Sequence, residues 1–439
     1  MRDVIDGLMG RARADLEALV RIPSVSASSF DPARVRESAA ATAALFEAEG
    51  LATELLEVDG AHPAVLATYP AHAGSPTVLL YAHHDVQPPG DETLWLTPPF
   101  EPTERGGRLY GRGSADDKAG VVMHLAAIRA FGGKPPVGVT VFIEGEEETG
   151  SENLPAFLER YGDRMRADAV ILADSGNWRI GEPALTTSLR GLVACVVEVR
   201  TLDHAVHSGM YGGPIPDALT SLTRLLASLH DEKGNVAIGG LHTSSAADLD
   251  MTEDELRRES GVLPGVELLG DGTLTERIWA RPAVAVLGID APSVANAINQ
   301  LIPAARAKVS LRIAPGEDPA RAMDALVGHL ERNAPWGAQV RVTRGAAAPP
   351  FAVNSAGRAY DAAKDAMADA WGTRPVEMGV GGSIPFVAAF ADAFPEAALL
   401  LTGVEDPDTR AHGENESLHL GEWAKACLAE TLFLRRMAE

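Results

Sequence analysis

The sequence predicts an α/β fold with a mostly parallel sheet flanked by helices, plus an inserted smaller α+β domain. Four short, continuous apolar runs are typical of strands buried on both faces, as in a parallel sheet covered by helices. These runs are Thr77–Ala82, Val137–Ile143, Ala169–Ala173 and Ala397–Leu401. An amphipathic helical pattern over Gly120–Phe131 separates the first two runs, which is the order of a β–α–β unit.

Further elements follow from the same periodicities. Helical patterns precede the first apolar run, over Val4–Val20 and Arg34–Gly50. After about residue 188 the pattern of alternating helices and buried strands gives way to two strand–helix units whose strands can pair antiparallel. The earlier helix–strand pattern resumes after residue 347. The units comprise strands over Leu192–Thr201, Lys308–Ile313 and 339–344, and helices over Asp217–Leu229 and Pro319–Asn333. We therefore expect residues 188–345 to be inserted into a larger domain built from 1–187 and 346–439. The sequence assigns no role to residues 231–281.

Length and composition limit the classes of protein. A chain of 439 residues predicts two domains. The net charge of −23, spread along the chain, argues against nucleic acid or an anionic membrane as partner. The N-terminal segment has the pattern of an amphipathic helix and not that of a signal peptide. No run reaches the ~20 apolar residues that a membrane span needs. We therefore expect a cytoplasmic location. Cys195 and Cys427 form no C-x-x-C pair, which excludes cysteine zinc sites and disulfide frameworks.

Metal-binding side chains follow each of the four apolar runs. The first run leads into His83-His84-Asp85, the second into the acidic run 144–148, the third into Asp174, and the fourth is followed by His412. Ligands of open α/β sheets bind beyond the carboxyl ends of the strands. The sequence therefore predicts a metal site at this edge of the sheet.

The spacing of His83 and Asp85 predicts that they act together. Side chains alternate between the two faces of a strand, so these two point the same way and His84 points the other way. A carboxylate that accepts the imidazole N–H fixes the tautomer of a metal-bound histidine, which makes His83 the ligand and Asp85 its orienter. An isolated H-x-D pair is also typical of a solvated surface.

The acidic run 144–148 indicates a bound cation, because crowded carboxylates repel one another without one. Glu147 and Glu148 are adjacent, so one of them can bind a metal ion while the other takes a proton from metal-bound water. Asp116 precedes a predicted helix, where an N-cap is the simpler interpretation. The chain has no P-loop, G-x-G-x-x-G or G-x-S-x-G pattern, which argues against phosphate-cradling and serine-hydrolase chemistry.

Taken together, these segments resemble the co-catalytic metallopeptidase family of aminoacylase, acetylornithine deacetylase, succinyl-diaminopimelate desuccinylase, carboxypeptidase G and carnosine-type dipeptidases. The dipeptidase branch is the most similar. The motifs that carry the resemblance fall in order along the chain: LLYAHHDVQP (79–88), LYGRGSADDKAG (109–120), EGEEETGS (144–151), ILADSG (171–176), HSGMYGG (207–213), GGSIP (381–385) and AHGENE (411–416).

The resemblance implies two divalent metal ions per subunit, with Asp116 bridging them and a cis peptide bond between Asp116 and Asp117. The implied ligands are His83, Asp116 and Asp174 for one ion, and Asp116, Glu148 and His412 for the other. Histidine and carboxylate ligands suit Zn²⁺, which we expect, and also Mn²⁺ or Co²⁺. Glu147 matches the general base and Asp85 the orienter of His83.

The inserted segment matches the family's lid or dimerisation domain, so the resemblance implies a homodimer. His207 matches a lid histidine that completes the site of the partner subunit, where it would stabilise the developing oxyanion. Three residues match groups that hold the substrate's carboxylate and backbone in the dipeptidases: Arg312, Gly382 and Ser383.

The expected function is amide hydrolysis of dipeptides or short peptides with a free C-terminal carboxylate. A water shared by the two metals would attack, with Glu147 as general base. An N-acyl-amino-acid deacylase or a carboxypeptidase G-like enzyme on the same scaffold is the alternative. A non-catalytic metal-binding protein is a third, against which the intact Glu147 argues.

Overall fold

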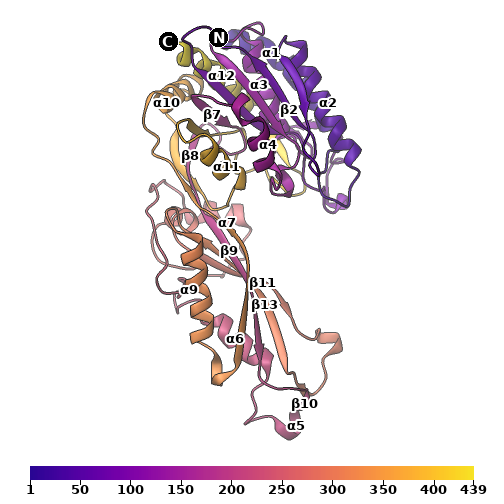
Figure 1. Ribbon diagram of the computed structural model, residues 1–439, viewed down its shortest axis with the longest axis vertical. Coiled ribbons are helices and arrows are strands. Elements are labelled where there is room, and N and C mark those ends of the chain that lie inside the picture. The colour runs from indigo at the N-terminus through magenta and orange to yellow at the C-terminus, as the bar shows by residue number, and fades with distance from the viewer. The chain divides into compact units, whose positions relative to one another are not determined.

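A computed structural model describes residues 1–439, apart from the side chain of Pro385. The chain divides into two compact units, shown in Figure 1. The first unit comprises residues 1–187, 353–378 and 385–439, and the second comprises 188–352 and 379–384.

The second unit differs from the predicted insertion at its C-terminal limit. It extends past residue 345 and takes in residues 379–384, which the sequence pattern assigns to the larger domain. Hydrogen bonds explain the difference, because Arg190 N donates to Val380 O at 3.2 Å and Arg190 Nε donates to Gly381 O at 3.0 Å. These contacts join two segments that lie far apart in the sequence.

A nine-stranded sheet, most of whose residues belong to the first unit, has four central strands that run parallel, and the predicted fold class is confirmed. The four apolar runs form this centre, in the spatial order β6 (Gly138–Glu144), β3 (Thr77–His83), β7 (Ala169–Leu172) and β17 (Ala398–Leu401). The outer strands are β1 (Ala52–Leu56), β2 (Ala64–Tyr69), β8 (Ala184–Leu189), β15 (Phe351–Ala352) and β16 (Val376–Val380). A separate three-stranded sheet comprises β4 (Thr103–Arg105), β5 (Arg108–Tyr110) and β18 (Ser417–His419).

Helices of the first unit cover this sheet. They are α1 (Arg2–Val20), α2 (Pro32–Ala48), α3 (Lys118–Arg129), α4 (Leu154–Tyr161), α10 (Arg358–Trp371), α11 (Pro385–Ala393) and α12 (Leu420–Ala438). Helix α3 packs against β3, α1 and α12, and all of its residues are buried. The prediction that this segment is amphipathic is therefore wrong, because α1 and α12 cover the side that would otherwise face water.

The second unit is a two-layer α+β structure. Its antiparallel sheet has the order β11 (Ala283–Asp290), β13 (Ala304–Ile313), β9 (Gly191–Arg200) and β14 (Gln339–Ala348). Helices α6 (Ala218–Ala227) and α9 (Pro319–Arg332) pack on it (Figure 1). Smaller elements are β10 (Val206–His207), α5 (Ser208–Tyr211), α7 (Glu253–Ser260), α8 (Leu274–Trp279) and β12 (Gln300–Leu301). Val193, Cys195, Val197 and Val199 of β9 are buried on the covered face of the sheet, and Ala194 on the other face is buried as well.

Both cysteines are buried and free. Within the described residues, no helix combines the length and the apolar character needed to cross a membrane.

Candidate active site

The functional side chains of the first unit gather where its parallel strands end. His83 is the last residue of β3, and it lies opposite Glu144 at the end of β6. A short turn carries Glu147 beyond β6, and Asp174 follows β7 by two residues. His412 lies in the loop between β17 and β18. Parallel strands present their carboxyl ends at one edge, so these four segments meet there.

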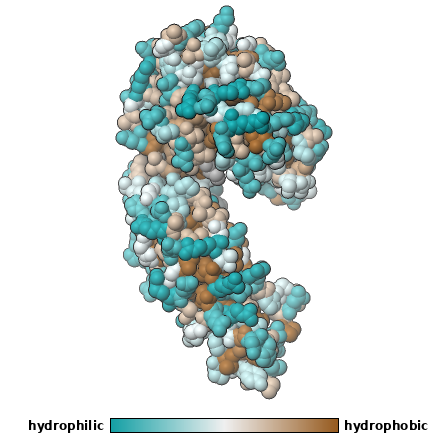
Figure 2. All heavy atoms as spheres, in the orientation of Figure 1, coloured by the Kyte–Doolittle hydropathy of each residue, from teal (hydrophilic) through white to brown (hydrophobic). Residues whose placement is uncertain are grey.

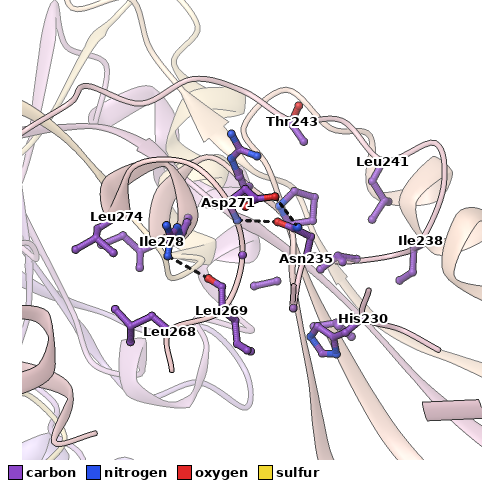
Figure 3. A pocket seen from close by; sticks show the side chains of 18 of the residues that line it. His230, Asn235, Ile238, Leu241, Thr243, Leu268, Leu269, Asp271, Leu274 and Ile278 are labelled. Carbon is purple, nitrogen blue, oxygen red and sulfur yellow. Dashed lines mark hydrogen bonds between the residues drawn. The ribbon is translucent and has the colours of Figure 1, made fainter. Parts of the chain in front are cut away.

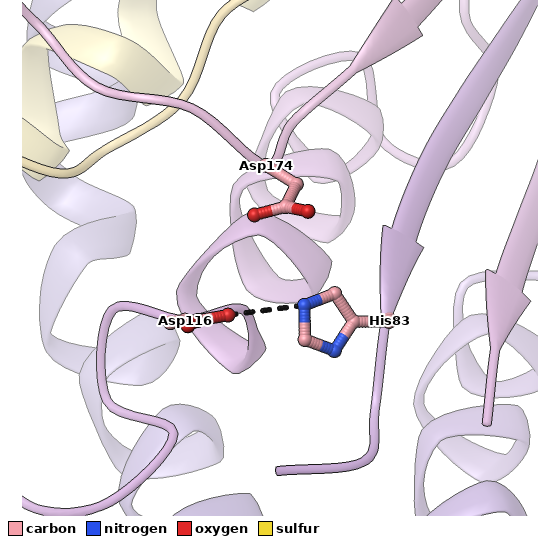
Figure 4. Close-up of side chains that lie close together, drawn as sticks. All are labelled: His83, Asp116 and Asp174. Carbon is pink, nitrogen blue, oxygen red and sulfur yellow. Dashed lines mark hydrogen bonds and ion pairs between the residues drawn. The ribbon is translucent and has the colours of Figure 1, made fainter. Parts of the chain in front are cut away.

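One candidate metal cluster comprises His83, Asp116 and Asp174, whose ligand atoms all lie within 4.8 Å of one another. Figure 4 shows both carboxylates directed towards the His83 ring. The Nε2 atom of His83 lies 3.1 Å from Asp116 Oδ1. His83 is fully buried and Asp116 is nearly so. This arrangement offers one nitrogen and two carboxylate oxygens to a cation.

A second cluster comprises Asp116, Glu148 and His412, again within 4.8 Å. His412 Nε2 lies 3.2 Å from Asp116 Oδ2 and 3.2 Å from Glu148 Oε2. Asp116 thus belongs to both clusters, one oxygen towards each, and its peptide bond to Asp117 is cis. The structure brings together all five residues that the sequence analysis expects as ligands.

Asp85 has a wider role in the structure than its spacing predicts. Its main-chain oxygen lies 3.1 Å from His83 Nδ1, and its Oδ1 lies 3.4 Å from the same atom. Its two carboxylate oxygens also accept hydrogen bonds from the backbone N–H groups of Glu147 and Glu148, each at 3.2 Å. Asp85 therefore fixes both the histidine and the turn that carries the two glutamates. His84 points elsewhere, with Nε2 2.9 Å from Pro63 O.

Gln87 is a site residue that sequence reasoning missed. Its backbone N–H donates to Glu148 Oε1 at 3.0 Å, and its side-chain Nε2 donates to Oε2 at 2.8 Å. Both oxygens of this candidate ligand are therefore oriented by one residue. Gln87 lies two residues after Asp85 in the motif HDVQP, which was the only indication in the sequence that it belongs to the site. No rule of sequence spacing predicts that a glutamine at this position contacts Glu148.

Glu416 is a second missed residue, and it holds the loop that carries Asp116. It pairs with Arg112 at 2.6 Å, and both side chains are buried. Its carboxylate also accepts hydrogen bonds from the backbone N–H groups of Gly113, Ala115 and Asp116, at 3.0–3.2 Å. The C-terminal segment thus fixes the backbone of the ligand that both clusters share.

We expect Glu416→Gln to destabilise the protein by about 3–5 kcal/mol, because it leaves the buried Arg112 guanidinium without a charged partner. Denaturant unfolding of the metal-free protein measures the change. Asp408→Asn, which alters an exposed carboxylate in the same segment, is the control. A loss within the ~0.5 kcal/mol that is usual for surface substitutions would contradict this role.

The charges of the site fit a divalent cation. Burial, with the charge of Asp116 adding to it, raises the pKa of Glu148 to about 7. Burial likewise raises the pKa of Asp174 to about 6. Hydrogen bonds to Asp116 and Glu148 raise the pKa of His412 to about 11. Without a metal, protons must therefore balance the crowded carboxylates, and cations would replace them.

This proton balance predicts that metal affinity rises with pH. At pH 7 the metal-free site holds a proton on His412 and part of one on Glu148, and both groups must lose them to bind metal. Zn²⁺ binding at pH 7 should therefore release roughly one to two protons. Calorimetric titration in two buffers of different ionisation enthalpy measures this number. Binding without proton release would contradict the assigned ligands.

The remaining predicted site residues lie in the second unit. His207 is exposed, and its Nδ1 accepts a hydrogen bond from Gly209 N at 3.0 Å, which leaves the ring proton on Nε2. Arg312 Nη1 donates to Ser383 Oγ at 2.9 Å, and this hydroxyl donates to Arg190 O at 2.7 Å. The structure therefore brings Arg312 and Ser383 into contact. Gly382 lies next to Ser383 in the chain.

Arg190 is a third residue that sequence reasoning missed. Burial and the nearby charge of Arg312 lower its pKa to about 10, so two guanidinium groups lie close together. Neither has an acidic partner among the described residues. A pair of cations without a counter-charge is suited to a carboxylate ligand.

Residues 231–281 form most of a pocket of about 370 Å³ in the second unit (Figure 3). Leucine and isoleucine side chains line much of it, and Asp271 N donates to Asn235 Oδ1 at 2.9 Å at its margin. None of the residues that line it belongs to the two metal clusters or to the arginine pair.

A parallel-centred α/β sheet with two histidine–carboxylate clusters at its carboxyl edge defines a metal-dependent hydrolase. The chain belongs to the peptidase family M20/M25/M40, which matches residues 79–436. The resemblance to the metallopeptidases is thereby confirmed, and the protein is a peptidase.

Individual relatives place the chain near dipeptidases. It is 37% identical over 367 residues to the cysteinylglycine-S-conjugate dipeptidase of Corynebacterium striatum, covering 82% of this chain and 81% of that one. It is 28% identical over 402 residues to the Beta-Ala-His dipeptidase of Homo sapiens, covering 86% and 78%. The crystal structure of human carnosine dipeptidase 1 matches with a TM-score of 0.81 at 26% identity, covering 100% of this chain and 98% of that one.

Proposed function

We propose that this protein is a metal-dependent dipeptidase that cleaves the amide bond of dipeptides or short peptides with a free C-terminal carboxylate. The observation that carries the proposal is Asp116, which is shared by two clusters of metal-binding side chains with Glu147 beside them. The similarity to dipeptidases for cysteinylglycine conjugates and for Beta-Ala-His supports this substrate class over N-acyl amino acids.

Two divalent ions, for which we propose Zn²⁺, would polarise the scissile carbonyl and acidify the attacking water. His83, Asp116 and Asp174 would hold one ion. Asp116, Glu148 and His412 would hold the other. Three protein ligands for each ion leave positions open, as a catalytic site needs.

Glu147 would take the proton from the attacking water and deliver it to the leaving amine. Burial, followed by the charge of Asp174, raises the pKa of Glu147 well above its usual value. A higher pKa brings this carboxylate nearer to the value that suits a general base at neutral pH. His207, with its ring proton on Nε2, would stabilise the negative charge that develops on the carbonyl oxygen.

The arginine pair would hold the C-terminal carboxylate of the substrate. Arg312 is already hydrogen-bonded to Ser383, so its guanidinium is oriented before substrate arrives. Arg190 adds a second positive charge close by. Gly382 and Ser383 would contact the substrate backbone.

We also propose a homodimer formed through the second unit, which would act as the lid. Strand β11 is an edge strand of its sheet, and Val286, Leu287 and Ile289 on it are exposed. Figure 2 shows further apolar surface near β10 and α5, where Met210 is 74% exposed. An unpaired edge strand can pair with another chain, and a large exposed apolar patch marks an interaction site. Two free, buried thiols suit a reducing compartment, so we propose a cytoplasmic location.

A hydrolysis panel tests the function. Unblocked dipeptides, including β-alanyl forms, should be cleaved at least about tenfold faster than their N-acetyl, N-succinyl and folate-type counterparts. Chelation should abolish cleavage, and added Zn²⁺, Mn²⁺ or Co²⁺ should restore it. Preferred cleavage of the N-acyl substrates would favour the deacylase alternative, and no cleavage by metal-loaded protein would refute both.

A further inference from the structure

Glu405 is a carboxylate at the metal site to which the mechanism above gives no task. It lies in the loop that follows β17, four residues beyond the end of that strand. Its backbone pairs with Gly176, and its carbonyl accepts a hydrogen bond from Asn177 N at 2.8 Å. These contacts fix Glu405 beside the segment that follows Asp174.

Glu405 lies close enough to the metal-binding residues for their charges to act on its carboxylate. Burial, followed by the charges of Asp116, Asp174 and Glu416, raises its pKa well above the usual value. The charge of His412 acts in the opposite direction. Taken as a whole residue, Glu405 is partly exposed. It lies against Gly176, where an added Cβ would meet the Cβ of Glu405 at 3.4 Å.

Most other carboxylates at this edge have partners. Asp85, Glu148 and Glu416 accept backbone hydrogen bonds, and Asp116 lies against two histidines. Asp174 belongs to a metal cluster, and Glu147 is the proposed base. Among the described residues, no hydrogen-bond donor or cation contacts the carboxylate of Glu405. A desolvated carboxylate without a partner is costly unless a ligand brings a positive charge to it.

We propose that Glu405 receives the free α-amino group of the substrate and thereby selects dipeptides over N-acyl amino acids. In a dipeptide the ammonium group is one carbon away from the scissile carbonyl, so a carbonyl held at the metal clusters brings it close to the residues around them. An N-acyl amino acid has no cation at this position and leaves Glu405 unpaired. The inference rests on the proposed function, and it names the group that separates the two substrate classes.

The test compares Ala-Gly with propionyl-glycine, which is the same molecule without the amino group. Wild-type enzyme should prefer Ala-Gly in kcat/KM. Glu405→Gln should lower kcat/KM for Ala-Gly by about 10–100-fold, the range expected for a charge-assisted hydrogen bond, and leave propionyl-glycine unchanged. Asp408→Asn is the matched control and should change neither value. Metal analysis of both variants should give the wild-type content.

The outcomes separate this inference from the proposed function. If Glu405→Gln lowers kcat/KM equally for both substrates, or if the variant loses metal, then Glu405 supports the metal site. The inference is then overturned, while the dipeptidase function stands. If the variant keeps the full preference for Ala-Gly, another group binds the amine and the inference is again overturned. If wild-type, metal-loaded enzyme cleaves no dipeptide, both proposals fail.

Discussion

Glu147→Gln is expected to lower kcat by about 10²–10⁴-fold while both metal equivalents are retained. The substitution keeps the size of the side chain and removes its ability to take a proton. Glu147 is absent from both groups of candidate ligands, so its loss should not release a metal. Its backbone N–H is held by Asp85, which keeps the turn in place in the variant.

Steady-state kinetics and metal analysis on the same preparation check this result. Glu152→Gln is the matched control, because Glu152 lies a few residues further along the same segment and is exposed. A variant with near-normal kcat would refute the role of Glu147 as general base. Loss of metal together with activity would instead make Glu147 a ligand.

Asp116→Asn is expected to abolish binding of both metals, whereas Asp174→Asn should leave the second cluster able to bind one. The reason is that Asp116 offers one oxygen to each cluster, and Asp174 belongs to one cluster. Activity should fall by more than the ~10–100-fold that is typical for loss of an outer-shell partner.

Metal analysis after dialysis against a weak chelator distinguishes the two variants. Circular dichroism should show the native content of helix and strand in both, because the substitution keeps the shape of the side chain. Two metal equivalents in purified Asp116→Asn would mean that the clusters do not share this residue, and the ligand assignment would be wrong.

The apolar runs predicted the centre of the fold and the location of the site. The predicted run Thr77–Ala82 corresponds to β3, which also includes His83. The run Ala169–Ala173 corresponds to β7, and Asp174 lies two residues beyond the end of that strand. Runs buried on both faces are recognisable because composition alone marks them. Strand β11 was missed although AVAVLGID is mostly apolar, because it follows a segment without a clear pattern.

The residues that orient the site could not be predicted in the same way. Glu416 bonds to a loop some 300 positions earlier, and Arg190 lies beside Arg312 only after the second unit has folded. No periodicity or short spacing encodes such pairs. The buried face of α3 was misjudged for the same reason, since the helices that cover it come from the two ends of the chain.

The order of the candidate ligands along the chain also has a consequence for biosynthesis. His83, Asp116 and Asp174 are translated before the second unit begins, so their cluster can form on a nascent chain. His412 and Glu416 follow more than 200 residues later, which takes on the order of tens of seconds at ~5–20 residues per second. Until then the shared aspartate lacks both its second histidine and the carboxylate that fixes its backbone. An unfinished chain therefore lacks part of the candidate metal site during most of its synthesis.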